Sequence, residues 1–411
     1  MPWLIQFCLA RVAFATMFTV WSAVLPLLKD DWALSAWQAG MVQSAYHVGF
    51  LVSLFSVGFL SDRFGARRVY LLSSVAAVAS AMLFAFLADG FASALLLYGL
   101  TGLCSGGSYT PGLALVAQQV TQRQGRAMGL YLAAASLGYA LGLLISSAML
   151  PLAGWRGAFV VTACGPVIGM ALGYWSLRGV PNVVHPRPEG HGNRAAIGEV
   201  LRNKPAMLSI WGYTFHAWEL LGLWAWLPAF LAMAAVAGGG DAANAVSLGA
   251  TLSALTYLAA VVGSVAGGTL SDRWGRTTVI LIMSLTSLAC SFGFGWMIGM
   301  PLWLLVAVAV IYNVSGVADS SIHSTTLTEL TPPRYLGAAY SLRSVLGFGA
   351  GAIAPWCFGL VLDAGRAIEL DTSTVWGLAW ATLGVGGLLG PLATWRLRLN
   401  PAAEKLAGGR R

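Results

Sequence analysis

The chain has 411 residues, of which 58% are hydrophobic and only 9% are charged. A soluble domain of this size carries far more charge on its surface, so the composition excludes an ordinary soluble protein. The net charge of +8 would fit a nucleic-acid partner, but the basic residues lie in short polar stretches between apolar runs, which is typical of a membrane protein.

Apolar runs of about 20 residues recur along the whole chain, and each is long enough to cross a hydrocarbon core roughly 30 Å thick. Backbone groups in lipid must be satisfied within the segment, so we expect these runs to be helices and not the short alternating strands of a β-barrel. The predicted spans cover residues 3–28, 37–60, 68–88, 92–119, 126–150, 156–178, 206–235, 244–270, 277–298, 301–328, 336–362 and 374–398.

The basic residues predict how these helices are oriented. If the N-terminus is inside and the chain weaves, only Lys29, Arg156 and Arg366 face outward, while Arg11 and Arg343 lie within helices. All other Lys and Arg residues then fall on the inner side, as the positive-inside rule requires. We therefore expect a multi-pass protein with both termini in the cytoplasm. The Ala- and Gly-rich composition with short loops favours a bacterial inner membrane.

The longest polar stretch predicts a division of the chain into two halves. Residues 179–205 are rich in Pro, Gly and charged residues, which is typical of a linker. We expect an N-terminal six-helix half at 1–178, a cytoplasmic linker at 179–205, a C-terminal six-helix half at 206–398 and a cytoplasmic tail at 399–411.

The two halves repeat one another. The charged phrase GFLSDRFGARRV at 58–69 returns as GGTLSDRWGRTT at 267–278. A second alignment places Tyr131 on Tyr340, at an offset of 209 residues. Two six-helix halves in parallel repeat, with substrate bound near the midplane, are an architecture of secondary transporters.

The repeated phrase resembles the loop between the second and third helices of each half in the major facilitator superfamily, whose pattern is similar to G-x-L-[SA]-D-R-x-G-R-[RK]. The resemblance extends over nearly the whole chain. The phrase departs from the pattern at Ala66, where an arginine is usual, and at Thr277, which takes the last basic place. The resemblance implies an all-α membrane protein with twelve transmembrane helices in two pseudo-symmetric six-helix halves. It also implies a secondary transporter that works by alternating access.

The charged phrase is predicted to act as a conformational latch. Glycine lets two helices approach closely. Each aspartate lies where its carboxylate can meet the N-terminal dipole of a helix from the other half, tethered by the arginines. A charge cluster that only orients the protein is the alternative. The predicted latch residues are Gly58, Asp62, Arg63, Arg67, Gly268, Asp272, Arg273 and Arg276.

Charged residues within the predicted spans are candidates for function, because a charge is expensive in lipid. Arg11 and Arg343 suggest an anionic substrate, since arginine holds an oxyanion through two parallel hydrogen bonds. Structural ion pairs with Glu219 or Asp319 are the alternative for both arginines. The predicted substrate-binding residues are Arg11, Tyr109, His216, Glu219, Asn313 and Arg343.

Three titratable residues are predicted to carry a coupling proton. They are Glu219, Asp319 and His323, and the last two are one helical turn apart. Carboxylates and imidazoles inside a membrane often form proton relays in transporters. A role of Asp319 in the cytoplasmic gate is the alternative.

One predicted span contains a break. The stretch SGGSYTP at 105–111 puts two glycines and a proline inside the run 92–119. Such residues kink or interrupt a helix, and Tyr109 can then offer its polar group to a cavity.

The sequence predicts no enzyme, no cofactor and no metal site. No P-loop or HExxH motif occurs, and all five cysteines fall inside apolar runs. The predicted partners are a small-molecule substrate, the lipid bilayer and protons as the coupling ion, without nucleic acid, and we expect a monomer. The preferred function is proton-coupled movement of a small anionic metabolite. The alternatives are proton-driven efflux of an apolar or drug-like compound and a non-transporting membrane sensor. Drug exporters of this family often carry a proline after the residue equivalent to Gly142. Leu143 stands there in this chain, which weakens the drug-export alternative.

Overall fold

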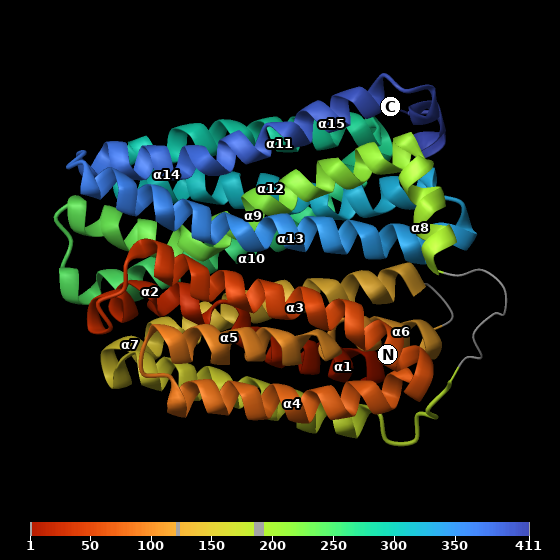
Figure 1. Cartoon of the computed structure of the whole chain (residues 1–411), viewed down its shortest axis with the longest axis horizontal. Coiled ribbons are helices and arrows are strands. Elements are labelled where there is room, and N and C mark those ends of the chain that lie inside the picture. The colour runs from red at the N-terminus through yellow and green to blue at the C-terminus, as the bar shows by residue number, and fades with distance from the viewer. Residues whose placement is uncertain (1, 121–123, 185–192, 411) are drawn as a thin grey trace. The chain divides into compact units, whose positions relative to one another are not determined.

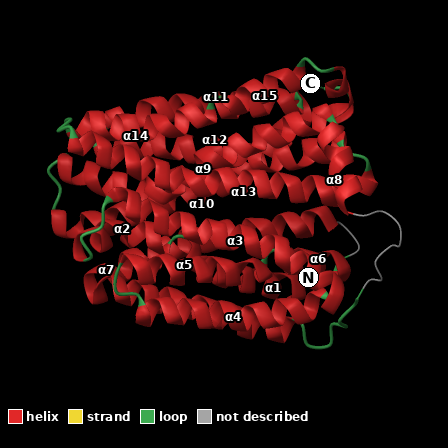
Figure 2. Ribbon diagram, in the orientation of Figure 1, coloured by secondary structure: helices red, strands yellow, loops and turns green. Residues whose placement is uncertain are grey.

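The computed structural model describes residues 2–120, 124–184 and 193–410, which are helical almost throughout (Figure 1, Figure 2). These described residues contain no strand. Eleven of their helices are long and apolar enough to cross a membrane. The structure therefore confirms the all-α membrane fold that the sequence predicts.

One of the eleven spans is long enough to cross twice. It covers Ala127–Ser176, 50 residues, whereas one crossing needs about 20. Within it, Gly154 has φ 61° and ψ −165°, a conformation that ends one helix and starts another. This break falls between the predicted spans 126–150 and 156–178, so the eleven described spans agree with the twelve-helix expectation.

The chain divides into two compact units. The first holds Met1–Arg187 with Leu227–Leu258, and the second holds Pro188–Trp226 with Ala259–Arg411. Helices α9 (Lys204–Ala237) and α10 (Ala242–Trp274) therefore contribute to both units. The boundaries that the repeat suggests for the two halves and the linker stay a prediction.

The other helices belong to one unit each. In the first unit these are α1 (Pro2–Ala15), η1 (Thr16–Phe18), α2 (Val20–Asp31), α3 (Ala36–Phe64), α4 (Ala66–Leu87), α5 (Phe91–Ser105), η2 (Gly106–Ser108), α6 (Thr110–Gln119) and α7 (Gln124–Ser176). In the second unit these are α8 (Asn193–Arg202), α11 (Arg276–Gly293), η3 (Phe294–Met297), α12 (Leu302–Leu330), η4 (Pro333–Tyr335), α13 (Leu336–Ala367), α14 (Thr372–Gly387), α15 (Leu389–Arg398) and η5 (Pro401–Gly408).

Each copy of the charged phrase turns the chain at a glycine. Gly65, with φ 85°, separates α3 from α4, and Gly275, with φ 94°, separates α10 from α11. Residues with a side chain rarely adopt these angles. The glycine in the middle of the phrase is therefore what lets one span end and the next begin within a single residue.

Glycines also set how closely the first helix of each half packs on its neighbour. A Cβ atom on Gly138 or Gly142 of α7 would overlap backbone oxygens of α1 and η1. In the second unit, a Cβ atom on Gly347 or Gly351 of α13 would overlap side chains of α9. Small residues at such contacts let membrane helices approach each other closely.

The predicted break within 92–119 and the predicted linker at 179–205 adopt different structures. The predicted break within 92–119 is present, because α5 ends at Ser105 and α6 begins only at Thr110. The predicted linker contains a helix of its own, α8. The part of that linker at 185–192 lies outside the described residues.

Candidate functional site

Arg11 lies in α1 and is buried, with 4% of its surface exposed. Its Nη1 donates a hydrogen bond of 2.6 Å to the hydroxyl of Ser108 in η2. Its guanidinium also faces the rings of Tyr109 and Tyr131, with Cζ 5.4 and 5.9 Å from the ring centroids. Among the described residues of its unit, no carboxylate comes within ion-pair distance of Arg11, and its Nε has no hydrogen-bond partner.

Arg343 lies in α13 and is buried in the second unit, with 8% of its surface exposed. Its Nη1 donates a hydrogen bond of 2.6 Å to the hydroxyl of Ser324 in α12. Its Cζ lies 4.0 Å from the ring centroid of Tyr213 and 5.1 Å from that of Tyr340. No ion pair to Asp319 or any other carboxylate of this unit is present within the described segments.

Asp319 of α12 is paired with imidazoles instead. His216 Nδ1 lies 3.0 Å from Asp319 Oδ1, close enough for an ion pair but not aligned for a hydrogen bond. His323 Nε2 lies 3.8 Å from Asp319 Oδ2. The other ring nitrogen of His216 shares a hydrogen bond of 2.7 Å with Ser320. The sequence paired Asp319 with His323 alone, and the structure adds the closer His216.

Glu219 lies one turn from His216 on α9 and is held by hydroxyl groups. Ser291 of α11 donates a hydrogen bond to its carboxylate, and the same hydroxyl also bonds the phenol of Tyr312 in α12. All three side chains are buried. The carboxylate therefore has partners that can reorient when it gains or loses a proton.

A small cavity joins the two carboxylates. Glu219, His216, Asp319 and His323 all line a cavity of about 10 Å³ in the second unit, which is room for about one water molecule. The structure thus brings together the three residues that the sequence predicted as proton carriers. It also places His216, predicted to bind substrate, among them.

Tyr213 connects this cluster to Arg343. Its ring centroid lies 5.6 Å from that of His216 and 6.2 Å from that of His323, while the guanidinium of Arg343 covers it. Asn313, also predicted to bind substrate, is fully buried and accepts a hydrogen bond of 2.9 Å from Trp224.

The serines that meet the arginines were missed by sequence reasoning. A serine in an apolar helix is common and carries no charge, so Ser108 and Ser324 give no signal of their own. The alignment of Tyr131 with Tyr340 was the sequence signal that could have indicated these surroundings, because it places one tyrosine of each half at corresponding positions.

The first copy of the charged phrase is held by the segment that follows α7. Asn182 accepts a hydrogen bond of 3.1 Å from the backbone of Arg68 and donates one of 2.7 Å to the carbonyl of Phe64. Arg67 donates to the carbonyl of Leu177 at 3.1 Å. Asp62 and Arg63, both predicted for the latch, are exposed.

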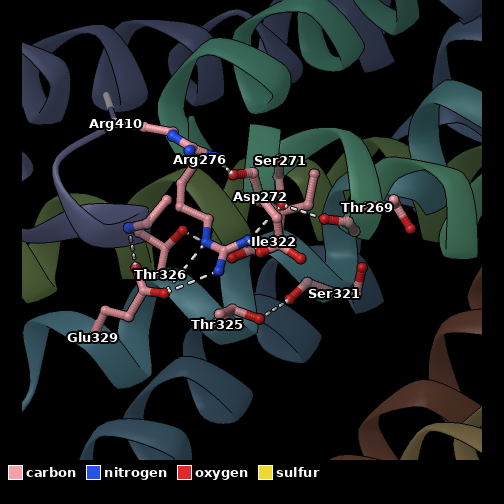
Figure 3. Close-up of polar contacts among 12 residues, drawn as sticks. Thr269, Ser271, Asp272, Arg276, Ser321, Ile322, Thr325, Thr326, Glu329 and Arg410 are labelled. Atoms are coloured by element: carbon pink, nitrogen blue, oxygen red, sulfur yellow. Dashed lines mark hydrogen bonds and ion pairs between the residues drawn. The ribbon is translucent and has the colours of Figure 1, made fainter. Parts of the chain in front are cut away.

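The second copy is organised around Arg276, as Figure 3 shows. Arg276 donates to Asp272 at 2.5 Å and to Glu329 at 3.0 Å, so one buried guanidinium neutralises two carboxylates. The C-terminal segment closes on the same loop. Arg410 donates to the backbone carbonyl of Asp272 at 2.6 Å, and the backbone of Ala407 donates to Glu329 at 3.0 Å.

The glycines at the start of the phrase, Gly58 and Gly268, have no tight neighbour within their own units. Within its unit, no described atom lies within 4 Å of the place a Cβ would take at Gly58, and at Gly268 the nearest is Ser321 Oγ at 3.9 Å. The close helix contact predicted for both is therefore not found inside either unit. Arg273, the remaining latch residue, is exposed.

Comparison with known proteins places this chain among membrane transporters. The model of the Major Facilitator Superfamily matches residues 7–355 and 240–411. A probable sulfoacetate transporter, SauU, from Cupriavidus necator is 25% identical over 91% of this chain and 90% of its own length. A probable 4-methylmuconolactone transporter from Cupriavidus pinatubonensis is 23% identical over 80% of this chain and 77% of its own length.

Solved structures show the same fold at low sequence identity. A bacterial homologue of the human lysosomal transporter Spinster, in an inward-facing and unoccupied conformation, has a TM-score of 0.74 and is 16% identical, with 100% of this chain and 98% of that chain covered. A mutant of the nucleoside transporter NupG also has a TM-score of 0.74 and is 14% identical, with 96% and 99% covered.

Proposed function

We propose that this chain, which belongs to the Major Facilitator Superfamily, moves a small organic anion across the membrane together with a proton. The family and the named relatives identify a membrane transporter and not an enzyme. Transport proceeds by alternating access in the bacterial inner membrane, with both termini in the cytoplasm. The distribution of basic residues supports that orientation.

The anionic nature of the substrate rests on Arg11. A guanidinium in a spanning helix needs a partner, a cavity or an anion. Arg11 has a hydroxyl and two aromatic rings but no carboxylate among the described residues of its unit. A carboxylate or sulfonate would supply the missing charge and accept hydrogen bonds from the guanidinium. The relatives named for sulfoacetate and 4-methylmuconolactone agree with a small, oxygen-rich substrate.

The proton is assigned to the cluster of the second unit. Glu219, Asp319 and His323, with His216, surround one water-sized cavity. A carboxylate with two neighbouring imidazoles offers several groups that can hold a proton within one buried cluster. The proposed role of the charged phrase as a latch is supported by Arg276, which holds Asp272 and Glu329 together at the loop.

Uptake into proteoliposomes tests this function. The purified protein is reconstituted, a pH gradient is imposed, and labelled sulfoacetate and other small organic anions are offered. We expect at least one of these anions to accumulate when the gradient is present and to equilibrate when a protonophore removes it. Accumulation of apolar or cationic compounds, with no small anion moved, would instead support the drug-export alternative.

A further inference from the structure

The C-terminal segment is folded against the second unit. After α15, residues 399–410 form η5 and a final turn, and the side chains of Ala403 and Leu406 are completely buried. The side chain of Asn400 accepts a hydrogen bond of 3.0 Å from the backbone of Ala402, which caps the start of η5. Burial of two apolar side chains and a formed cap mean that this segment has a defined place on the unit.

Polar contacts of the segment end on the second copy of the charged phrase and on α12 (Figure 3). Arg410 donates a hydrogen bond of 2.6 Å to the backbone carbonyl of Asp272, in the last turn of α10. A basic side chain is favourable there, because the last carbonyls of a helix lack partners within the helix. The backbone of Ala407 donates to Glu329 Oε2 at 3.0 Å, in the last turn of α12.

The residue just before the segment adds a third helix. Arg398 ends α15, and its Nη1 donates to the hydroxyls of Thr277 and Thr278 at 3.1 and 2.6 Å, in the first turn of α11. The C-terminal part of the chain thus connects the neighbouring ends of α10, α11 and α12, which surround the charged loop.

Glu329 is shared between the segment and the loop. Its Oε2 accepts from Ala407, while its Oε1 accepts from Arg276 at 3.0 Å. Arg276 in turn binds the carboxylate of Asp272. A displacement of the loop relative to α12 therefore breaks contacts of Glu329, and a displacement of Asp272 also breaks its contact with Arg410.

The first unit repeats the principle with other residues. There the segment that follows α7 bonds the loop between α3 and α4. Asn182 bonds Phe64 and Arg68 on either side of the turn, and Arg67 donates to the carbonyl of Leu177. In each unit, the chain after the last span thus returns to the charged phrase of that unit.

We propose that residues 399–410 are a strap that restrains the loop between α10 and α11 and slows the conformational change of transport. The charged phrase can act as a latch only if the loop that carries Asp272 can shift, and each such shift works against the contacts of the strap. The strap touches none of the candidate substrate-binding residues, so it limits the rate and not the affinity for substrate. The inference rests on the proposed alternating access and adds a control of its rate.

Point variants of the full chain loosen or tighten the strap. Arg410→Ala removes the bond to Asp272, and Arg410→Lys keeps a charged donor. Ala407 has φ 48°, a left-handed conformation that favours glycine, so Ala407→Gly should hold the strap in place more firmly. Lys405→Ala is the control, because Lys405 is an exposed residue of the same segment.

Hydrogen exchange of the purified, substrate-free protein tests the restraint. We expect the amides of residues 270–280 to exchange about threefold or more faster in Arg410→Ala than in wild type, the effect of one lost charged hydrogen bond. Exchange should be slower than wild type in Ala407→Gly, close to wild type in Arg410→Lys and unchanged in Lys405→Ala.

Initial rates in proteoliposomes test the effect on transport. With the anion that the uptake panel selects, Arg410→Ala should raise the maximal rate about threefold at unchanged KM, because the same contact no longer has to break. Ala407→Gly should lower the maximal rate, also at unchanged KM, and Lys405→Ala should change neither.

The outcomes separate this inference from the proposed function. Unchanged exchange at 270–280 in Arg410→Ala overturns the strap, and so does faster exchange without a higher maximal rate. If wild type moves no small anion, the proposed function fails. Exchange needs no substrate, and in that case it alone decides whether residues 399–410 restrain the loop.

Discussion

Two buried charges of this protein are surrounded in different ways. Arg11 meets a hydroxyl and two aromatic rings, whereas Asp319 meets two imidazoles. The first environment holds no carboxylate among the described residues of its unit, and the second contains imidazoles, which are side chains that can accept and release a proton. Loss of the charge should therefore reduce substrate binding at Arg11 and proton coupling at Asp319.

Substitutions at Arg11 test the anion site. Arg11→Lys keeps the charge but loses the planar fork, so we expect binding of a small organic anion to weaken about tenfold, and Arg11→Ala to weaken it about a hundredfold. The midpoint of thermal unfolding should change little, and Arg156→Ala should change neither property. A different result would contradict the anion site. If the single variants are unstable and the double variant Arg11→Ala/Glu219→Ala recovers both stability and transport, Arg11 serves only to neutralise Glu219.

Neutral variants of the second-unit cluster test proton coupling. Glu219→Gln, Asp319→Asn and His323→Gln are each expected to bind and exchange substrate. At least one should lose accumulation driven by a pH gradient, because it can no longer carry the proton. His47→Gln is the control, a buried histidine that bonds Gln43 in the first unit. If all three still accumulate substrate against a gradient, the coupling group lies elsewhere.

The candidate residues were predictable only in part. A charge inside an apolar run is rare, so Arg11, Glu219 and Asp319 could be singled out from the sequence alone. The contact between His216 and Asp319 could not, because it joins two helices whose mutual rotation is set by packing and not by either helix's own pattern. The hydroxyl partners were missed for a similar reason, since serine is frequent in spanning helices.

At the scale of helices, glycines decide where spans end and how closely they pack. Gly65 and Gly275 end α3 and α10 with positive φ angles, and Gly154 breaks α7. Gly65 and Gly275 were recognisable because glycine within a charged loop is typical of turns, whereas Gly154 lies in the gap between two predicted spans. The role of Gly58 and Gly268 stays a prediction, since neither has a close neighbour among the described residues of its own unit.

Two glycines of the same helix provide a matched test of packing. Gly138→Ala should lower the midpoint of thermal unfolding, because its Cβ would overlap α1, and overpacking costs about 1–3 kcal/mol. Gly129→Ala should leave the midpoint unchanged or raise it, since no described atom lies within 4 Å of that Cβ and alanine favours helix. Equal effects of the two substitutions would mean that α1 and α7 are not in tight contact there.

The C-terminal segment provides a test of the second loop. Glu329 bonds both Arg276 and the backbone of Ala407, so Glu329→Ala should expose residues 399–410 to proteolysis and lower stability by about 1–3 kcal/mol. Glu199→Ala removes an exposed pair with Arg202 and should change stability by less than about 0.5 kcal/mol. A tail that stays protected in Glu329→Ala would show that its buried apolar residues hold it without this carboxylate.

At the scale of the whole molecule, the repeat is what made the fold predictable. Two copies of a charged phrase at matching loops indicated the architecture, and the family comparison confirms it. The substrate was not predictable to the same depth, because this fold supports many different substrates and specificity depends on a few side chains. The described residues hold separate polar groups in each unit, Arg11 with Ser108 in the first and the Glu219–Asp319 cluster in the second.

Counterflow in proteoliposomes tests anion transport most directly, because it needs a carrier that opens to each side in turn but no ion gradient. Vesicles are loaded with the unlabelled anion that the uptake panel selects, and the labelled anion is added outside. We expect wild type and Asp319→Asn to accumulate label transiently above its equilibrium level, and Arg11→Ala to show no such overshoot. No overshoot of wild type with any small organic anion, or a full overshoot of Arg11→Ala, would contradict transport of an anion bound by Arg11.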